Sequence, residues 1–410
     1  MKFFLSEIKL AGIKNIKKPI KIVFNDKKVL SLEELDKNNV KAIYGPNGSG
    51  KSAIVHGFDV LSSLLVENDY LLNSHNKNYL YSILNRKSKN ITIQIKVLHE
   101  EEIVNTYNYE VVVGFLEGEF YVLLEKYSKD NKTLIEINNG KFINAIIPEN
   151  LKEIFNNKLE KSTFNALLTN MLKENNGLLE TLNGYSLTPF LMFFSNIMAM
   201  LDTSEKVKEP YSILKDNNDF RIEEKDSFKY IKADKLEVYE KDLKKKEMFL
   251  KIFKPEIKGL SYDKKLVDNS YYEVSEYVLY DDYMILLELE STGIKKLINL
   301  YAGFKHLDKG GLLIVDELDS HINDIYLLKL IEFSSLYTNG QLIFTTHNTS
   351  PMTFLRTKNN AIDFLTMDGK LISWKQIGNY SPARLYQAGM IENLPFNLTA
   401  EDFIRVFHDE

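Results

Sequence analysis

The sequence predicts an α/β fold in which a mixed sheet and a β-rich N-terminal lobe are split by a mostly helical insertion. Over residues 40–61, a short apolar run leads through a glycine-rich loop into apolar residues at helical spacing. Residues 91–145 alternate apolar and polar side chains between turn signals, which predicts an antiparallel meander. Residues 150–260 are polar-rich with helical spacing, and strand–helix alternation of parallel-sheet type returns over 270–350.

These patterns divide the chain into three expected parts. They are an N-terminal lobe at 1–150, a helical insertion at 151–265 and a C-terminal lobe at 266–410. The 410 residues are enough to bury a substantial core. The insertion lacks the long heptad runs of a coiled coil, so we expect a compact helical subdomain rather than an extended arm.

The glycine-rich loop is a complete P-loop with the pattern G-x-x-x-x-G-K-[ST]. Its residues are Gly45, Pro46, Asn47, Gly48, Ser49, Gly50, Lys51 and Ser52. The glycines let backbone N–H groups point at an anion, and the helix N-terminus adds partial positive charge. Lys51 is placed to reach the β/γ-phosphates and Ser52 to take a position on Mg²⁺. The competing interpretation is a glycine turn that binds nothing, and the strand–loop–helix context argues against it.

A second apolar run, residues 311–315, ends in the acids Asp316 and Glu317. Asp316 at the strand end is expected to complete the Mg²⁺ shell, as a Walker B aspartate does. Glu317 is then placed to polarise the water that attacks the γ-phosphate. Acids after a strand are common, so this assignment depends on the P-loop being present as well.

Further polar residues fall in a fixed order around this second run. Ser291 and Gly293 open a helical stretch before it, and Asp319 follows it directly. A third apolar run ends at His347. Ser291 also suits an ordinary helix N-cap, and the N–H groups of such a helix end can bind a phosphate.

This order of motifs resembles that of ABC-type ATPases of the RecF, Rad50 and SMC kind, in which an insertion separates the P-loop from the Walker B strand. The long interval between Lys51 and Asp316 suits that class better than a small GTPase or a compact kinase. The resemblance is strongest to stand-alone RecF/SMC-like ATPases of prokaryotic defence and abortive-infection loci, often called AAA-type ATP-binding proteins. It covers roughly residues 1–115 and 270–395 by motif, including the N-terminal strand pair and the tail at 380–390.

The resemblance implies a fold, a chemistry and an assembly. The fold is an ABC-type P-loop ATPase head that binds ATP with Mg²⁺ and hydrolyses it. The residues it assigns to catalysis are Lys51, Glu317 and His347. Ser291 and Gly293 look like the signature motif, which would cap the γ-phosphate held by Lys51 and Ser52 of a second copy, with Asp319 in the D-loop. A head-to-tail homodimer that sandwiches ATP is therefore the expected assembly.

One departure from this class concerns the Q-loop glutamine that such ATPases carry after an early strand. The candidate here is Gln94, inside the alternating run at 91–97. Its side chain suits a sheet face equally well. The Q-loop is therefore left unassigned.

Three functions fit these motifs. The first is a defence ATPase that senses infection and gates a separate toxic effector such as a nuclease, because the motor is complete and the sequence shows no effector site. The second is a RecF-like DNA repair ATPase. The third is a scaffold that uses ATP to oligomerise with negligible turnover. Resemblance of fold alone does not decide among them.

Charge and composition limit the kinds of ligand and partner that this protein is expected to bind. The net charge of −5 weighs against strong non-specific DNA binding, and nucleic acid stays open only through local basic patches. The densest patch, residues 241–247, is interpreted as the solvated face of a helix. Cysteine is absent, which excludes a disulfide framework and a cysteine-ligated zinc site. The longest apolar stretch, 187–201, is too short to span a membrane and reads as a buried helix or a partner-facing surface. No membrane partner and a cytoplasmic location are expected.

Overall fold

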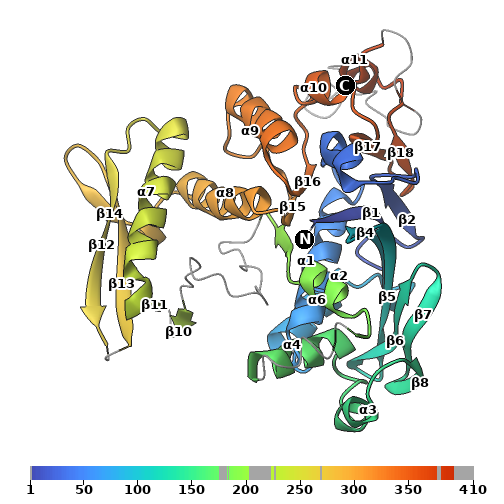
Figure 1. Ribbon diagram of the computed structural model, residues 1–410. Coiled ribbons are helices and arrows are strands. Elements are labelled where there is room, and N and C mark those ends of the chain that lie inside the picture. Colours follow the sequence, from blue (N-terminus) through green and yellow to red (C-terminus); the bar gives the residue numbers. More distant parts are fainter. Residues whose placement is uncertain are drawn as a thin grey trace, which may run out of the picture.

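The computed structural model describes residues 2–174, 182, 184–202, 223–225, 228–267, 270–375 and 380–391 (Figure 1). Three sheets organise these residues, and each has its own strand order. The seven-stranded sheet belongs to the N-terminal lobe, the six-stranded sheet carries the P-loop, and the five-stranded sheet lies beside α7. The α/β fold class predicted from the sequence is confirmed.

The N-terminal lobe is an antiparallel sheet in the order β2-β1-β4-β5-β6-β7-β8. Its strands are β1 (Lys2–Ala11), β2 (Ile20–Val23), β4 (Asn90–Glu100), β5 (Val104–Leu116), β6 (Glu119–Lys129), β7 (Lys132–Asn138) and β8 (Lys141–Ala145). Tight turns link β5 through β8, and each places two residues in the left-handed region, as at Asn139 (φ 46°) and Gly140 (φ 70°). Such turns match the twist of antiparallel strands, so the predicted meander is confirmed.

The central sheet has the order β18-β17-β3-β16-β15-β9. Its strands are β3 (Val40–Tyr44), β9 (Ile197–Met200), β15 (Leu312–Val315), β16 (Gln341–Thr345), β17 (Ile362–Leu365) and β18 (Leu371–Ser373). All neighbours pair in parallel except β17 and β18, which makes the sheet mixed. The C-terminal ends of β9, β15, β16, β3 and β17 therefore meet at one edge, where open α/β sheets bind their ligands.

Alternate residues of the central strands enter two different cores. In β15, Leu312 and Ile314 pack with α1 (Lys51–Val66) and the N-terminal sheet. Leu313 and Val315 face the opposite core. That second core also contains the buried face of α8 (Thr292–Asp308) and of α9 (Asp324–Tyr337). The continuous apolar run of this strand thus reflects burial on both faces.

The remaining helices are short or belong to the edges of these layers. They are η1 (Leu32–Asn38), α2 (Ser74–Ile83), α3 (Glu149–Phe155), α4 (Phe164–Glu174), α6 (Thr188–Phe194), η2 (Ala233–Lys235), α7 (Leu236–Phe253), η3 (Leu287–Leu289), α10 (Met352–Leu355) and α11 (Pro382–Gln387). Helix α1 matches the P-loop helix that the sequence predicts over residues 51–66. Among the described residues, no helix combines the length and the apolar character that a membrane span requires.

The range expected to be a helical insertion contains strands as well as helices, and this differs from the prediction. The apolar stretch at 187–201 is not one helix, because α6 ends at Phe194 and β9 then joins the central sheet beside β15. Parallel pairing with β15, which is distant in sequence, overrides the helical spacing of this stretch. The domain limits at 150 and 265 remain a prediction.

A second difference concerns the parallel character expected over 270–350. The strand β13 (Tyr271–Leu279) is antiparallel to each of its partners, which are β11 (Phe228–Lys232), β12 (Gly259–Leu266) and β14 (Met284–Leu286). With β10 (Glu223–Lys225) they form the five-stranded sheet. Figure 1 shows this sheet and α7 on the far side of α8 from β15. Only β15 and β16 follow the expected parallel pattern within that range.

The basic run on α7 is mostly a solvated face, as predicted, with one exception. Lys241, Lys244 and Lys245 are exposed. Lys246 instead is buried and pairs with the buried carboxylate of Glu276 on β13 at 2.8 Å. Lys246 therefore joins α7 to its sheet and is not part of any basic surface.

Candidate nucleotide site

The P-loop follows β3 and passes into α1, and at two of its glycines, Gly45 and Gly50, an added Cβ would clash with a neighbour. Gly50 has φ 109°, and a Cβ there would lie 2.4 Å from the side-chain oxygen of Asn15. A Cβ on Gly45 would lie 2.5 Å from the carbonyl oxygen of Leu365, at the end of β17. Asn15 also donates to the carbonyl of Gly48 at 2.8 Å. The loop is thus held from both sides, with its backbone turned as an anion cradle requires.

Lys51 points back over the loop from the first turn of α1. Its ammonium donates to the carbonyls of Gly45 at 2.7 Å and Pro46 at 3.2 Å, and the side chain is buried. Burial lowers the pKa of Lys51. The charges that oppose this shift are the carboxylates of Glu317, Asp316 and Asp319. The structure therefore brings the P-loop lysine and the Walker B acids together.

Asp316 and Glu317 follow β15 and are fixed by Thr345 at the end of the neighbouring strand β16. The Thr345 hydroxyl donates to the buried carboxylate of Asp316 at 2.6 Å and accepts from the backbone N–H of Glu317 at 2.8 Å. Glu317 has φ 47°, a left-handed conformation that is uncommon for a residue with a side chain. Such strain persists where surrounding contacts fix the backbone, and it gathers at functional sites.

His347 lies two residues beyond β16, at the same edge of the sheet. Partial removal from water lowers its pKa, and the nearby ammonium of Lys51 lowers it further. The carboxylates of Asp319, Glu317 and Asp316 oppose this shift. The imidazole is therefore neutral at pH 7 and lies within the field of the same four charged groups.

Three oxygen atoms at this edge are buried and have no hydrogen-bond partner within the described residues. They are the hydroxyl of Tyr44, Oγ of Ser49 and Oδ1 of Asp319. Buried polar groups are nearly always paired, so an unpaired one marks a place where a ligand or water is expected. Burial, together with the charge of Asp319, raises the pKa of Tyr44, which places Asp319 close to the end of β3.

The signature residues lie at the start of α8 and face a different neighbour. Ser291 caps the helix by accepting from the N–H of Ile294 at 3.4 Å. A Cβ on Gly293 would lie 3.7 Å from the side chain of His321. The side chain and backbone N–H of Ser291 form hydrogen bonds with Ile294 and Glu290, and within the described residues neither forms one with the P-loop.

Lys296, one turn into α8, joins three segments. Its ammonium donates to Oδ1 of Asp202 and to the carbonyl of Glu317, both at 2.7 Å, and it contacts the hydroxyl of Ser320. Asp202 follows β9, so Lys296 bridges the ends of two neighbouring strands, β9 and β15. Ser320 completes the triangle by donating to Asp202 at 2.8 Å.

Sequence reasoning missed several of these residues. Thr345 lies in the apolar run that ends at His347 and Lys296 in the helical stretch that Ser291 opens, but no role was predicted for either, and Asp202 belongs to no motif. All three act through neighbours that are far away in the chain. Asn15 lies in the loop between β1 and β2, where no pattern indicated a contact with the P-loop. Gln94, the Q-loop candidate, donates to Glu110 across the β4–β5 pair at 2.7 Å and remains without an assigned role at the nucleotide site.

The donor set of the site fits Mg²⁺ held jointly with a nucleotide. Ser52 and Asp316 offer hard oxygen ligands, which Mg²⁺ prefers. In the part of the chain that the structure describes, no group of three or more histidines, cysteines or carboxylates could hold a metal by itself. Mg²⁺ in ATPases typically uses one or two protein ligands and completes its shell with phosphate oxygens and water, so the two ligands suffice.

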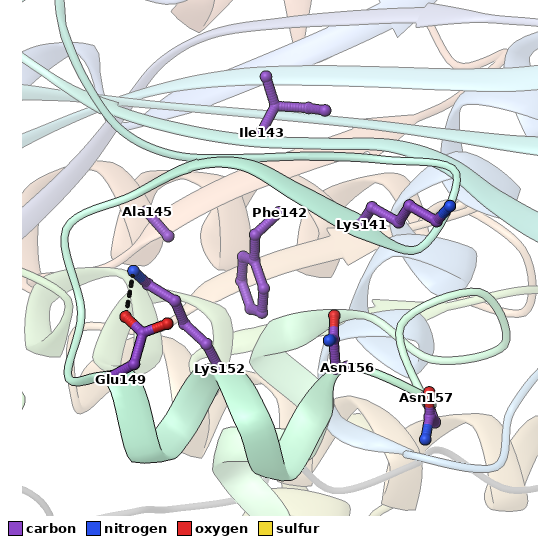
Figure 2. Close-up of a pocket in the computed structure, with 8 residues that line it drawn as sticks. All are labelled: Lys141, Phe142, Ile143, Ala145, Glu149, Lys152, Asn156 and Asn157. Carbon is purple, nitrogen blue, oxygen red and sulfur yellow. Dashed lines mark hydrogen bonds and ion pairs between the residues drawn. The ribbon is translucent and has the colours of Figure 1, made fainter.

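A surface pocket of about 480 Å³ lies elsewhere, between β8 and α3 (Figure 2). Phe142 points into the space between the strand and the helix, and the Lys152–Glu149 ion pair borders it. This pocket is at the edge of the N-terminal sheet, away from the central sheet that carries the P-loop. It has no part in the nucleotide site.

The fold and the residues at this sheet edge define a P-loop ATPase of the ABC type. Residues 41–350 match the family described as "AAA domain, putative AbiEii toxin, Type IV TA system", and the chain belongs to this family. The resemblance to abortive-infection ATPases is thereby confirmed.

Two solved structures of the recombination mediator protein RecF of the RecFOR pathway are also similar. The structure designated RecF-ATPrS is 14% identical and the one designated RecF-ATP is 15% identical; each match covers 91% of this chain and 99% of the other, with a TM-score of 0.42. A likeness this remote has no bearing on function. No curated protein matches the chain.

Proposed function

We propose that this chain hydrolyses ATP with Mg²⁺, that two copies close around the nucleotide, and that this closure gates a separate toxic effector during phage infection. The observation that carries the proposal is the convergence of Lys51, Asp316, Glu317 and His347 at the edge of one sheet, next to a complete P-loop. Belonging to a family of AAA domains supports it.

Each residue of the convergence has a distinct role in this proposal. The P-loop N–H groups and Lys51 hold the β- and γ-phosphates, while Ser52 and Asp316 hold the Mg²⁺ that neutralises phosphate charge when bound. Glu317 accepts a hydrogen bond from the attacking water and orients it. His347, neutral at pH 7, donates a hydrogen bond toward the γ-phosphate.

The proposed dimer follows from the position of the signature residues. Ser291 caps its own helix, and the added Cβ of Gly293 would face His321. The N-terminus of α8 has free N–H groups that suit a phosphate. In the head-to-tail dimer these groups cap the γ-phosphate bound by a second copy, with Asp319 nearby, and each site is completed by its partner.

The family description, which reads "putative AbiEii toxin, Type IV TA system", supports a role in a toxin–antitoxin system, and the gating of a separate effector is our proposal for that role. A nucleotide favours the closed dimer only through contacts that the open state lacks, and the γ-phosphate provides such contacts. Hydrolysis removes them and reopens the dimer. A nuclease or other toxic protein that binds one of the two states would be switched by this cycle.

Measurements of phosphate release and of the mass of the oligomer test the proposed ATP hydrolysis and the proposed dimer together. Glu317→Gln is expected to retain ATP as a dimer while turnover falls by about 100-fold or more. Lys51→Ala is expected to lose ATP binding and stay monomeric, and Lys87→Ala, an exposed lysine, serves as the matched control. A monomeric Glu317→Gln at saturating ATP contradicts the sandwich. Absence of phosphate release by the wild type contradicts the ATPase.

A mixing experiment tests whether the site is shared. Lys51→Ala and Ser291→Arg are each expected to be inactive, because one lacks the phosphate-binding lysine and the other blocks the helix end. Mixed in equal amounts, they form heterodimers in which one of the two sites is intact, so turnover returns. Turnover that does not return on mixing contradicts the shared site.

The effector is tested by affinity capture. Tagged Glu317→Gln and Lys51→Ala are recovered from native cells with ATP, and the retained protein and nucleic acid are identified. A stoichiometric protein held by only one variant supports gating, and its identity is then checked by the loss of phage protection when its gene is deleted. Retention of DNA without a protein partner contradicts gating.

A further inference from the structure

A chain of four polar side chains links the N-terminal loop to the P-loop helix and to α2. The Nζ atom of Lys14 lies 2.7 Å from Nε2 of His56, and Nδ1 of His56 lies 2.7 Å from the hydroxyl of Tyr79. The Tyr79 hydroxyl donates to Asp59 at 2.8 Å. His56 and Asp59 lie four and seven residues after Ser52 on α1, so all three share one helix face.

The hydrogen bonds that join these four side chains all run in one direction. An ammonium group has donors only, so Nε2 of His56 must accept from Lys14, and the ring proton then lies on Nδ1. Nδ1–H donates to the oxygen of Tyr79, whose own proton points to Asp59. Burial, together with the charge of Lys14, lowers the pKa of His56 to about 4, which agrees with a neutral ring.

Lys14 itself is anchored at the nucleotide edge. Its backbone has φ 48° and is held by the end of α2: its N–H donates to Ile83 at 2.5 Å, and the Asn85 side chain donates to its carbonyl at 2.6 Å. The next residue, Asn15, contacts the P-loop at Gly48. Asp316 is the charge that counteracts the lowering of the pKa of Lys14 by burial.

We infer that His56, Tyr79 and Asp59 are positioning residues that hold the ammonium of Lys14 at the phosphate end of the nucleotide. Helix α2 thus fixes Lys14 in two ways. Ile83 holds the backbone of Lys14, and Tyr79 supports His56, which holds the ammonium. The inference rests on the proposed function in one respect, namely that the P-loop binds a nucleoside triphosphate.

Supporting residues are useful here because a lysine side chain is flexible. A free lysine side chain loses much rotamer freedom when it is ordered by a ligand, which weakens binding. Lys14 is ordered in advance, and an ammonium has three donors, so it can keep His56 and still donate to a phosphate oxygen. Preorganised donors of this kind strengthen binding without new contacts.

Titration calorimetry of the full chain with Mg²⁺ and ATP, ADP or AMP tests this role. Lys14→Met is expected to weaken ATP binding by about tenfold and AMP binding much less, because charge-assisted hydrogen bonds to phosphate are lost. His56→Leu should weaken ATP binding in the same pattern by a smaller factor. His56→Gln should restore it, because an amide can accept from Lys14 and donate to Tyr79.

A double-mutant cycle separates positioning from general damage. Lys14→Met with His56→Leu should bind ATP no worse than Lys14→Met alone, since His56 acts only through Lys14. Lys17→Met, an exposed lysine of the same loop, is the matched control and should bind normally. If His56→Leu fails to fold, Tyr79→Phe makes the same test, because it removes the hydroxyl that supports His56.

Three results would overturn the inference. They are unchanged ATP binding by His56→Leu or Tyr79→Phe, equal weakening of ATP and AMP by Lys14→Met, and additive losses in the double variant. A wild type that binds no ATP at all is a different failure, because it removes the proposed function itself.

Discussion

The hydroxyl of Thr345 donates to the buried carboxylate of Asp316 at 2.6 Å and so ties the end of β16 to the end of β15. The same oxygen accepts from the backbone of Glu317 at 2.8 Å. One side chain therefore orients both a proposed metal ligand and the residue proposed to activate water.

Thr345→Val keeps the shape of the side chain and removes both hydrogen bonds. We expect a loss of about 1–3 kcal/mol in the free energy of unfolding, because a buried N–H and a carboxylate oxygen lose their partner. Turnover should fall by about 10- to 100-fold as Glu317 moves from its position. Thr346→Val is the control, since Thr346 is equally buried and accepts from Asn348 instead. Equal losses of turnover in both variants would contradict the role of Thr345.

Lys296→Met should separate the start of α8 from the loop after β15. The variant loses the contacts with Asp202, Ser320 and the carbonyl of Glu317. We expect turnover to fall by about tenfold or more while ATP affinity changes little, because the P-loop is untouched. Steady-state kinetics with ATP make the measurement. The neighbouring Lys295→Met should behave as the wild type, and similar losses in both variants would show a general charge effect.

Gly50→Ala should abolish nucleotide binding through a steric clash. The added Cβ would lie 2.4 Å from the side-chain oxygen of Asn15 in a left-handed backbone, so either the loop shifts or Asn15 gives up its hydrogen bond to Gly48. Gly118→Ala is the matched control, because Gly118 has φ 86° and a Cβ there meets nothing within 4 Å. The control is expected to lose about 1–2 kcal/mol of stability from backbone strain alone. Thermal unfolding and ATP titration separate the two effects, and normal ATP binding by Gly50→Ala would refute the argument.

Glu125 makes stability depend on pH. It is fully buried between Tyr109, Tyr127 and the N–H of Phe164, and burial raises its pKa to about 7 from 4.5 in the unfolded chain. Between these two pH values the folded state holds a proton that the unfolded state has released. The contribution of Glu125 to stability is therefore full below about pH 4.5 and is lost as the pH rises to about 7.

The comparison with Glu125→Gln isolates this effect, because other titrating groups cancel. The difference in unfolding free energy between wild type and variant should fall by about 3 kcal/mol from pH 4.5 to 7 and stay constant above pH 7. Urea unfolding at a series of pH values makes the measurement. If the difference between the two proteins does not change with pH, Glu125 does not make the free energy of unfolding depend on pH.

Sequence reasoning predicted those parts of the site in which the motif and the structure that it forms lie within one short segment of the chain. The P-loop and α1 lie within one continuous segment, so glycine spacing and helical periodicity are sufficient. Thr345 and Lys296 act across strand ends that only the folded sheet brings together. The same limit applies to residues 187–201, where pairing with β15 turned half of an expected helix into β9.

The strand that carries the P-loop, β3, lies between β16 and β17 in the central sheet. Both neighbours come from the last quarter of the chain, since β16 begins at Gln341 and β17 at Ile362. During synthesis, therefore, β3 has neither of its partners until the chain has been made beyond Gln341. An ATPase built this way is inactive as a nascent chain, and a fragment that ends before β16 leaves both edges of its P-loop strand open to aggregation.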